Sequence, residues 1–436
     1  MVVVFLLVLV VVLALLGAVH WYVWRRLVRD LTAPGGPARR VGTAAAVVLP
    51  LLSVAALVSG RAGAPFGLQQ AVAWPGFLWL ALLLYLTLAL AVTEPLRPLL
   101  RRVLARRAGA TPVAAPVPVP TPAPPGAEAT APPEAAAPPE ATAPPEAAAR
   151  PEAPQVPDAP GLSRRLFVNR VVSGTAAAVA VGTVGAGTYG VLRGPRVKRV
   201  TVPLAKLPRG AHGYRIAVVS DIHLGPILGR AHTQRIVDTI NATQPDLVAV
   251  VGDLVDGTVQ DLGPAAEPLA RLRARDGSFF VTGNHEYFSG ADAWVDHVRE
   301  LGLHPLRNAR VEIGAGFDLA GVDDVAGESE GHGPDFGRAL GDRDRARTAV
   351  LLAHQPIVID DAVRHGVDLQ LSGHTHGGQL WPGNYLAELA NPTVAGLERY
   401  GDTQLYVSRG AGAWGPPVRV GAPSDITVVE LASRQA

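Results

Sequence analysis

Side chains of the types that bind metals gather in five short segments of this chain. The segments contain Asp221 and His223, Asp253, Asn284 and His285, His354, and His374 and His376. Imidazole nitrogens together with carboxylate and amide oxygens are ligands for Zn²⁺, Mn²⁺ or iron. Because the chain contains no cysteine, a cysteine nucleophile is excluded and any metal must be held by nitrogen and oxygen.

The charges in this set suit a pair of divalent ions that bind an anion. Two such ions carry four positive charges, and Asp221 and Asp253 together supply two negative ones. Ions held close together also need a shared bridging ligand, such as a carboxylate. The remaining positive charge would attract a hydroxide and a phosphate group, which favours phosphoryl chemistry.

Each of the five segments follows a run of apolar residues that is typical of a buried strand. The runs and their ends read YRIAVVSDIH, LVAVVGD, SFFVTGNHE, AVLLAHQP and LQLSGHTHGG. Asp221 and Asp253 are 32 residues apart, and Asp253 and Asn284 are 31 apart, which suits a strand, a helix and a return strand. Because ligands gather at the carboxyl ends of parallel strands, the spacing predicts a mixed α/β domain with all three side chains at one sheet edge.

The backbone after each strand is expected to direct these side chains together. Asp221 and His223, like His374 and His376, are two residues apart, so an extended backbone points each pair to one side. Gly377 and Gly378 would permit a tight turn beside them. Any one segment alone, such as a lone histidine after a strand, is more often structural. The coincidence of five segments in a workable order favours the metal site.

These motifs carry a family resemblance. DIH, GD, GNHE, the histidine of AHQP and GHTHGG, in this order, resemble the five motifs of the calcineurin-like metallophosphoesterases over residues 200–431. The ending GAGAWGPPVRVGAPSDITVVEL is similar to the membrane-associated or exported bacterial branch. The resemblance implies a four-layer αββα sandwich in which strands at residues 349–371 and 405–407 form a second sheet.

The resemblance also implies a site with two divalent ions, which would be Mn, Zn or Fe. One ion would be held by Asp221, His223 and His376, the second by Asn284, His354 and His374, and Asp253 would bridge them. A hydroxide bridging the ions would attack phosphorus in line. His285 would be a catalytic residue that faces the substrate and protonates the leaving oxygen, and Glu286 would either orient it or form a surface salt bridge.

Three long apolar runs open the chain, at residues 2–24, 41–60 and 71–92. Each is near the ~20 residues that a helix needs to cross a bilayer. A cleaved signal peptide is disfavoured for the first run because no basic residues precede it. For the second run, which contains Pro50, a buried soluble helix is the alternative. We predict a membrane domain at residues 1–107 with three transmembrane helices.

The next two segments differ sharply in composition. Residues 108–162 are dominated by Ala, Pro and Glu with a repeated APPEA, which predicts a disordered linker. Residues 163–192 begin with SRRLFVN and continue into a mildly apolar run. They resemble a twin-arginine signal, with a plain fourth transmembrane helix as the alternative. The catalytic domain is then expected at residues 193–436.

The arginines predict the orientation in the membrane. They cluster between the first and second runs and again after the third, so the positive-inside rule puts the N-terminus outside and the linker in the cytoplasm. The fourth run would return the catalytic domain to the extracytoplasmic side of the cell membrane. Four basic residues just beyond that run count against this orientation, and they are Arg193, Arg196, Lys198 and Arg199.

The leading hypothesis is a multi-pass, membrane-anchored phosphohydrolase acting on a phosphodiester, lipid or cell-envelope substrate. The alternatives are a membrane-anchored binding or sensing protein with an inactive domain, and an enzyme on the cytoplasmic face. No nucleic-acid partner is expected, because 39 basic and 37 acidic residues nearly balance. Asp323 and Asp324 are assigned to a loop turn, with contact to a substrate as the alternative. Trp381 and Trp414 are assigned to core packing, with a place in the cleft or in the membrane interface as the alternatives.

Overall fold

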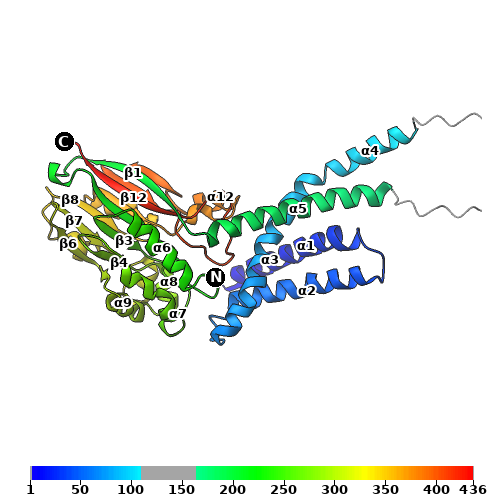
Figure 1. Cartoon of the computed structure of the whole chain (residues 1–436), viewed down its shortest axis with the longest axis horizontal. Coiled ribbons are helices and arrows are strands. Elements are labelled where there is room, and N and C mark those ends of the chain that lie inside the picture. The colour runs from blue at the N-terminus through cyan, green and yellow to red at the C-terminus, as the bar shows by residue number, and fades with distance from the viewer. Residues whose placement is uncertain (1, 110–163, 436) are drawn as a thin grey trace, which may run out of the picture.

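The computed structural model describes residues 2–109 and 164–435, which form a bundle of long helices and an α/β domain (Figure 1). The predicted linker, residues 108–162, and its repeats lie almost entirely outside the described residues, and the division into segments stays a prediction. The helices α1 to α5 form the bundle. The α/β domain begins at β1.

The bundle contains the apolar runs found in the sequence. Its helices are α1 Val2–Trp24, the π-helical turn η1 Arg25–Arg29, α2 Pro37–Val58, α3 Phe66–Thr93, α4 Leu96–Gly109 and α5 Arg164–Leu192. Among the described residues, α1, α2, α3 and α5 are long and apolar enough to cross a membrane. In α2, side chains such as Val47, Leu51 and Val54 are exposed, which favours a lipid-facing helix over the buried alternative.

Polar contacts join the ends of α1 and α3, and α4 to α5, at one end of the bundle. Arg26, just after α1, pairs with Glu94 at the end of α3. The Arg97 guanidinium donates to Asn169 Oδ1 at 3.2 Å and to Ser173 Oγ at 2.9 Å, both near the start of α5. The arginine-rich ends of α1 and α3 therefore lie together, away from the α/β domain. The side of the membrane that this end faces stays a prediction.

Two mixed sheets form the centre of the α/β domain. The first contains β1 Arg196–Leu204, β2 Tyr214–Val219, β3 Leu247–Val251, β4 Ser278–Val281, β5 His304–Pro305 and β12 Asp425–Ser433. The second contains β6 Ala309–Ile313, β7 Phe317–Gly321, β8 Thr348–Leu352, β9 Leu369–Ser372, β10 Gly396–Tyr400 and β11 Thr403–Val407. Their strand orders are β1-β12-β2-β3-β4-β5 and β10-β11-β9-β8-β7-β6.

Alternating side chains hold four layers together. In β2, Ile216 and Val218 belong to the apolar core shared with the second sheet. Their neighbours Ala217 and Val219 pack with the helices on the other face, because successive side chains in a strand point to opposite faces. Those helices are α6 Arg230–Ala242, α7 Val259–Ala266 and α9 Ala291–Glu300. The helices α10 Phe336–Leu340 and α11 Ile359–Arg364 cover the second sheet. The predicted αββα sandwich is confirmed.

Parallel strands bring the predicted site to one edge. β2 pairs with β3 and β3 with β4, both in parallel, and β8, β9 and β11 are also parallel neighbours. The loops after β2, β3 and β4 therefore leave the first sheet at the same edge. The expectation from the spacing of Asp221, Asp253 and Asn284 is confirmed.

The bundle and the α/β domain are tightly joined. Only residues 193–195 separate α5 from β1, and β1 pairs along its whole length with β12. On α5, an added Cβ at Gly187 would lie 2.7 Å from Val418, so the two parts approach closely. On α3, the Tyr85 hydroxyl donates to the Trp381 carbonyl at 3.0 Å.

Candidate metal centre

The candidate ligands all stand on loops at the carboxyl ends of strands. Asp221 and His223 follow β2, Asp253 follows β3, Asn284 begins α8 (Asn284–Ser289) after β4, His354 follows β8, and His374 and His376 follow β9. The structure brings all seven into one cluster that both sheets supply. Rigid strands thus hold the beginning of each loop, as a preorganised site requires.

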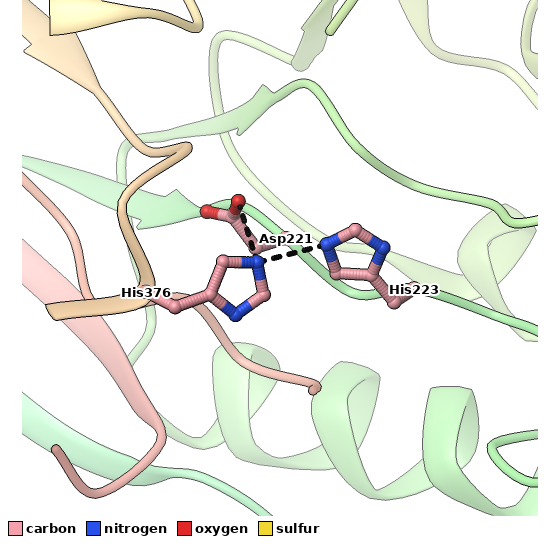
Figure 2. Close-up of side chains that lie close together, drawn as sticks. All are labelled: Asp221, His223 and His376. Atoms are coloured by element: carbon pink, nitrogen blue, oxygen red, sulfur yellow. Dashed lines mark hydrogen bonds and ion pairs between the residues drawn. The ribbon is translucent and has the colours of Figure 1, made fainter. Parts of the chain in front are cut away.

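Asp221, His223 and His376 form the first group of the cluster, and all three are buried (Figure 2). Nε2 of His223 lies 2.9 Å from Nε2 of His376, which lies 3.3 Å from Oδ1 of Asp221. Figure 2 shows the three side chains converging from two loops, with Asp221 and His223 on one and His376 on the other. Two imidazole nitrogens and a carboxylate oxygen directed at one point are a plausible ligand set for a divalent ion.

Asp253, His354 and His374 form the second group, and their ligand atoms lie within 4.8 Å of one another. Asp253 Oδ2 is 3.0 Å from Nε2 of His354 and 3.8 Å from Nε2 of His223. Asn284 joins this group, because its Oδ1 lies 3.0 Å from Nδ1 of His374. Asp253 stands between the two groups, as a bridging carboxylate would.

The backbone of the cluster is strained. Five of the seven candidate ligands adopt positive φ, and these are Asp221 at 51°, His223 at 48°, Asp253 at 52°, His374 at 71° and His376 at 53°. Left-handed conformations cost a non-glycine residue about 1–3 kcal/mol each. Such strain persists only where the surrounding structure enforces it and collects at functional sites, which supports a functional role for the cluster.

The outer nitrogens of two histidines are already engaged. Nδ1 of His354 lies 2.9 Å from the Val251 carbonyl, to which it must donate, so in the neutral ring Nε2 carries the lone pair. That buried Nε2 has no hydrogen-bond partner, although the Asp253 carboxylate is close. Nδ1 of His223 similarly lies 2.9 Å from Asp256 Oδ1. Partners on the outer nitrogen are typical of metal-ligating histidines, so the residues present fit divalent ions.

The electrostatics of the cluster favour bound cations. Burial opposes charge on His223, but the Asp256 carboxylate outweighs burial and raises the pKa of His223 to about 9. The pKa of His354 is also raised, because Asp253 outweighs its burial. Burial, with the positive His354 nearby, lowers the pKa of His374 to about 4. The carboxylates thus draw positive charge into the cluster at selected positions.

Comparison with known proteins gives the family. The model of the calcineurin-like phosphoesterase family matches residues 214–378. A protein from Aquifex aeolicus named as an uncharacterized metallophosphoesterase is 35% identical over 240 residues, which are 54% of this chain and 91% of that protein. The chain belongs to the calcineurin-like phosphoesterase family.

Other members of the family are also similar to this chain. A Danio rerio protein named as a transmembrane protein with metallophosphoesterase domain is 40% identical over 258 residues, which are 56% of this chain and 59% of that protein. A Helicobacter pylori protein named as an uncharacterized metallophosphoesterase is 38% identical over 248 residues, 56% of this chain and 66% of that protein. The chain therefore spans about three fifths of the Danio rerio relative.

Asp256 belongs to the candidate site but was missed by the sequence reasoning. Its Oδ1 lies 2.9 Å from Nδ1 of His223 and 2.7 Å from Nδ1 of His285. Burial opposes its ionisation, but His223 and His285 outweigh burial and lower the pKa of Asp256 to about 2. One carboxylate therefore orients both a candidate ligand and the candidate proton donor. The signal in the sequence is weak, because Asp256 is only a second aspartate in the loop GDLVDG.

Arg419 was also missed, although it lies within the quoted C-terminal segment. Its buried guanidinium donates to the carbonyl of His376 at 3.0 Å and lies at the same distance from Nδ1 of His376. It also donates to the Gly412 carbonyl at 2.7 Å. Burial lowers the pKa of Arg419 to about 10. Arg419 therefore fixes the position of the His376 ring.

Two interpretations of Glu286 were wrong. It neither orients His285 nor forms a surface salt bridge, because its side chain is fully buried. The carboxylate accepts from the backbone N–H groups of Gly283, Asp253 and Leu254 at 2.6 to 2.9 Å. Burial and the negative Asp253 raise the pKa of Glu286 to about 7. Glu286 ties the loop after β3 to the start of α8.

The remaining aspartate and tryptophan assignments had mixed outcomes. Asp324 caps a 3₁₀ turn by accepting from the Ala326 N–H, which confirms the turn assignment for this residue. Asp323 instead forms an ion pair with Arg307. Core packing was wrong for both tryptophans, since Trp381 and Trp414 are 49% and 53% exposed. The Trp414 ring lies 5.7 Å from the His285 ring and lines the cavity above the cluster.

Close backbone approach explains the glycines of the motifs. An added Cβ at Gly283 would lie 2.3 Å from Oδ1 of Asp253, so no larger residue fits between β4 and the candidate bridging carboxylate. Gly377 and Gly378 have φ of 61° and 80°, which confirms the predicted tight turn beside His376. The positions of these glycines in this chain are thus set by sterics as well as by turn geometry.

Proposed function

We propose that this chain is a membrane-anchored phosphoesterase that uses two divalent ions, of Mn, Zn or Fe, to hydrolyse a phosphoester. The observation that carries the proposal is the placing of Asp253 between two groups of candidate ligands. Asp221, His223 and His376 would hold one ion, and Asn284, His354 and His374 the other. Membership of the calcineurin-like phosphoesterase family supports the reaction class.

Metal ions bound in this cluster would stabilise the charge of the phosphoryl oxygens as Lewis acids and lower the pKa of a water molecule. Hydrolysis forms a bond between the water oxygen and phosphorus and breaks the bond from phosphorus to the leaving oxygen. That leaving oxygen must then gain a proton. The chain has to supply the proton and to hold the ester in line.

His285 is positioned to supply the proton. Its ring lies 4.7 Å from the His223 ring, it lines the cavity, and it is only partly buried. Asp256 accepts a hydrogen bond from its Nδ1 at 2.7 Å, which holds the ring in position. The other ring nitrogen is then available to donate to the leaving oxygen, as general acid catalysis requires.

The four long apolar helices support anchoring in a membrane. Placement of the catalytic domain outside the cytoplasm rests on the arginine distribution and remains part of the proposal. The same holds for the phosphodiester, lipid or cell-envelope nature of the substrate. The twin-arginine reading of Arg164 and Arg165, which begin α5, stays a prediction.

The proposal is tested with the purified full chain in detergent, loaded with Mn²⁺ or Zn²⁺. Bis(p-nitrophenyl) phosphate and p-nitrophenyl phosphate serve as diester and monoester probes, and metal content is measured by inductively coupled plasma mass spectrometry. We expect about two ions per chain and turnover that His354→Ala abolishes. His304→Ala, an exposed histidine on β5, is the matched control and should retain both. Equal turnover in the two variants would refute the proposal.

A further inference from the structure

The cavity above the metal-ligand cluster is much larger than a phosphoryl group needs. Its volume is about 990 Å³, at the upper end of the usual range for small-molecule sites. Asp253, Asn284, His374 and His376 line its inner end. The rest of the cavity therefore leaves room for a further part of the substrate.

Apolar side chains make up most of that further part. The wall residues are Leu84, Phe288, Leu380, Tyr385, Leu386 and Trp414. Among the described residues that line the cavity, Arg61 is the only lysine or arginine. A nucleotide or polyphosphate would require more cationic partners than this. The wall instead suits hydrocarbon, whose transfer from water is favourable.

One wall residue belongs to a candidate membrane-spanning helix. Leu84 lies within the apolar stretch of α3, Phe66–Thr93. Nearby, Tyr85 donates to the Trp381 carbonyl, and Leu380, Val418 and Val420 pack with the apolar side chains of α3 and α5. The cavity therefore adjoins the interface between the catalytic domain and the bundle, and its wall includes a residue of a candidate membrane-spanning helix.

The short helix α12, Gly383–Ala390, lies between the catalytic domain and the bundle helices (Figure 1). None of its residues is buried. Leu386 and Leu389 are 71% and 84% exposed and stand three positions apart on one helix face. Exposed leucines beside an apolar cavity are costly in water and typical of a helix that lies in a membrane interface.

We propose that the cavity binds an amphiphilic phosphoester that resides in the bilayer. Its phosphoryl group lies at the metal-ligand cluster, and its hydrocarbon part lies between α12 and α3. α12 rests in the bilayer surface with Leu389 directed into the lipid. This inference rests on the proposed phosphoesterase function and adds the substrate class.

A homologous series of diesters tests the substrate class in the full chain reconstituted in lipid nanodiscs with Mn²⁺. Methyl, butyl and hexyl p-nitrophenyl phosphates share one head group and one leaving group and differ only in the alkyl chain. Below micelle-forming concentrations we expect kcat/KM to rise at least tenfold from the methyl to the hexyl ester. Leu84→Gln should flatten the rise, whereas Leu68→Gln, an exposed position on the same helix outside the cavity, should retain it.

The outcomes separate this inference from the proposed function. Hydrolysis of all three esters with equal kcat/KM would overturn the inference and leave the phosphoesterase standing. A complete lack of hydrolysis of every ester would overturn both. A rise in kcat/KM that Leu84→Gln and Leu68→Gln reduce equally would also count against the cavity, because the gain would then come from general partitioning into lipid.

A spectroscopic measurement tests α12 without relying on turnover. The chain has no cysteine, so a spin label attached at Leu389→Cys reports from a single site. In nanodiscs we expect this label to be more accessible to oxygen than to a water-soluble nickel chelate. A label at Asp402→Cys, a fully exposed position in the turn between β10 and β11, should show the reverse. Equal accessibility profiles at the two sites would overturn the placement of α12.

Discussion

The metal-ligand cluster and the apolar wall of the same cavity are built in opposite ways. The cluster consists of strained, hydrogen-bonded residues, most of them buried, on loops that the two sheets hold. The wall consists of partly exposed apolar side chains from α3, α12 and separate loops. The cluster is rigid and specified locally, whereas the wall exists only because distant segments meet. Reaction chemistry therefore depends on short local motifs, whereas substrate choice depends on tertiary contacts. Substitutions in the cluster and in the wall should affect the two properties separately.

The largest effect is expected from Asp253→Asn, which acts on the cluster alone. The change removes the carboxylate that stands between both groups of candidate ligands. Turnover of bis(p-nitrophenyl) phosphate should fall by more than about 100-fold, since even outer partners of metal ligands are worth 10–100-fold. Metal content should fall below two ions per chain, as measured by mass spectrometry. If the variant retained two ions per chain, Asp253 would not be the bridging ligand.

His285→Gln should reduce chemistry without removing metal. Loss of a general acid costs about 10²–10⁴-fold in rate, and the cost depends on the leaving group. The loss should be larger for phenyl esters than for p-nitrophenyl esters, because the better leaving group needs less protonation. Steady-state kinetics with both ester types checks this. An equal loss for the two leaving groups would assign His285 to binding instead.

Asp256→Asn should have an intermediate effect. The carboxylate contacts both His223 and His285, so the change should lower turnover by about 10–100-fold. The measurement is kcat/KM with p-nitrophenyl and phenyl diesters, together with metal content. A partial loss of metal accompanied by a leaving-group effect would match the double contact. Unchanged metal and kinetics would mean that the two hydrogen bonds are dispensable.

Trp414→Ala acts on the wall alone. Contacts between aromatic rings contribute about 0.5–1.5 kcal/mol each, so kcat/KM for apolar esters should fall by up to about tenfold. Metal content should stay at the wild-type value, because Trp414 contacts the His285 ring and no candidate ligand is paired with it. Mass spectrometry and a comparison of methyl with hexyl esters check this. Loss of metal in this variant would break the separation between wall and cluster.

The smallest effect comes from a buried histidine that belongs to neither region. Burial, together with the positive Arg235 and Arg419, lowers the pKa of His232 to about 4. Its unfolded-state pKa is near 6.5, so the unfolded chain binds the proton more readily and stability falls as pH drops from 6.5 towards 4. Between pH 7 and 5.5 the loss should be about 1 kcal/mol.

Thermal unfolding followed at several pH values measures this loss, and His232→Gln should weaken the pH dependence while leaving metal content unchanged. Both nitrogens of His232 lack hydrogen-bond partners among the described residues. If His232→Gln changes the stability but not the metal content, His232 is a structural histidine and not a metal ligand. A loss of metal would extend the cluster to α6.

The cluster was predictable because its information is local. Each candidate ligand follows a recognisable strand, and the spacing from Asp221 to Asp253 and Asn284 already implied parallel pairing. The supports of the cluster were less visible, because Asp256 and Arg419 act through contacts that only the folded chain creates. Glu286 was misjudged because a charged residue beside a histidine gives no sign in sequence of three backbone partners.

The wall was not predictable for a different physical reason. Leu84 is one leucine within a long apolar run, and sequence does not distinguish a leucine that lines a cavity from one that faces lipid. α12 has eight residues, too few to show a clear helical period. Trp414 was assigned to the core with the cleft as an alternative, but its exposed ring lies beside the His285 ring. Such walls depend on tertiary assembly that no short pattern records.

The junction between α5 and β1 determines how far the reaction centre stands from the lipid. Only three residues separate α5 from β1, and β1 is paired along its whole length. No flexible linker therefore lets the catalytic domain move away from the end of α5. The distance of the catalytic domain from the end of α5 is then fixed. A substrate whose scissile bond lies at a different depth from the metal-ligand cluster cannot react, however well the rest of the molecule would bind.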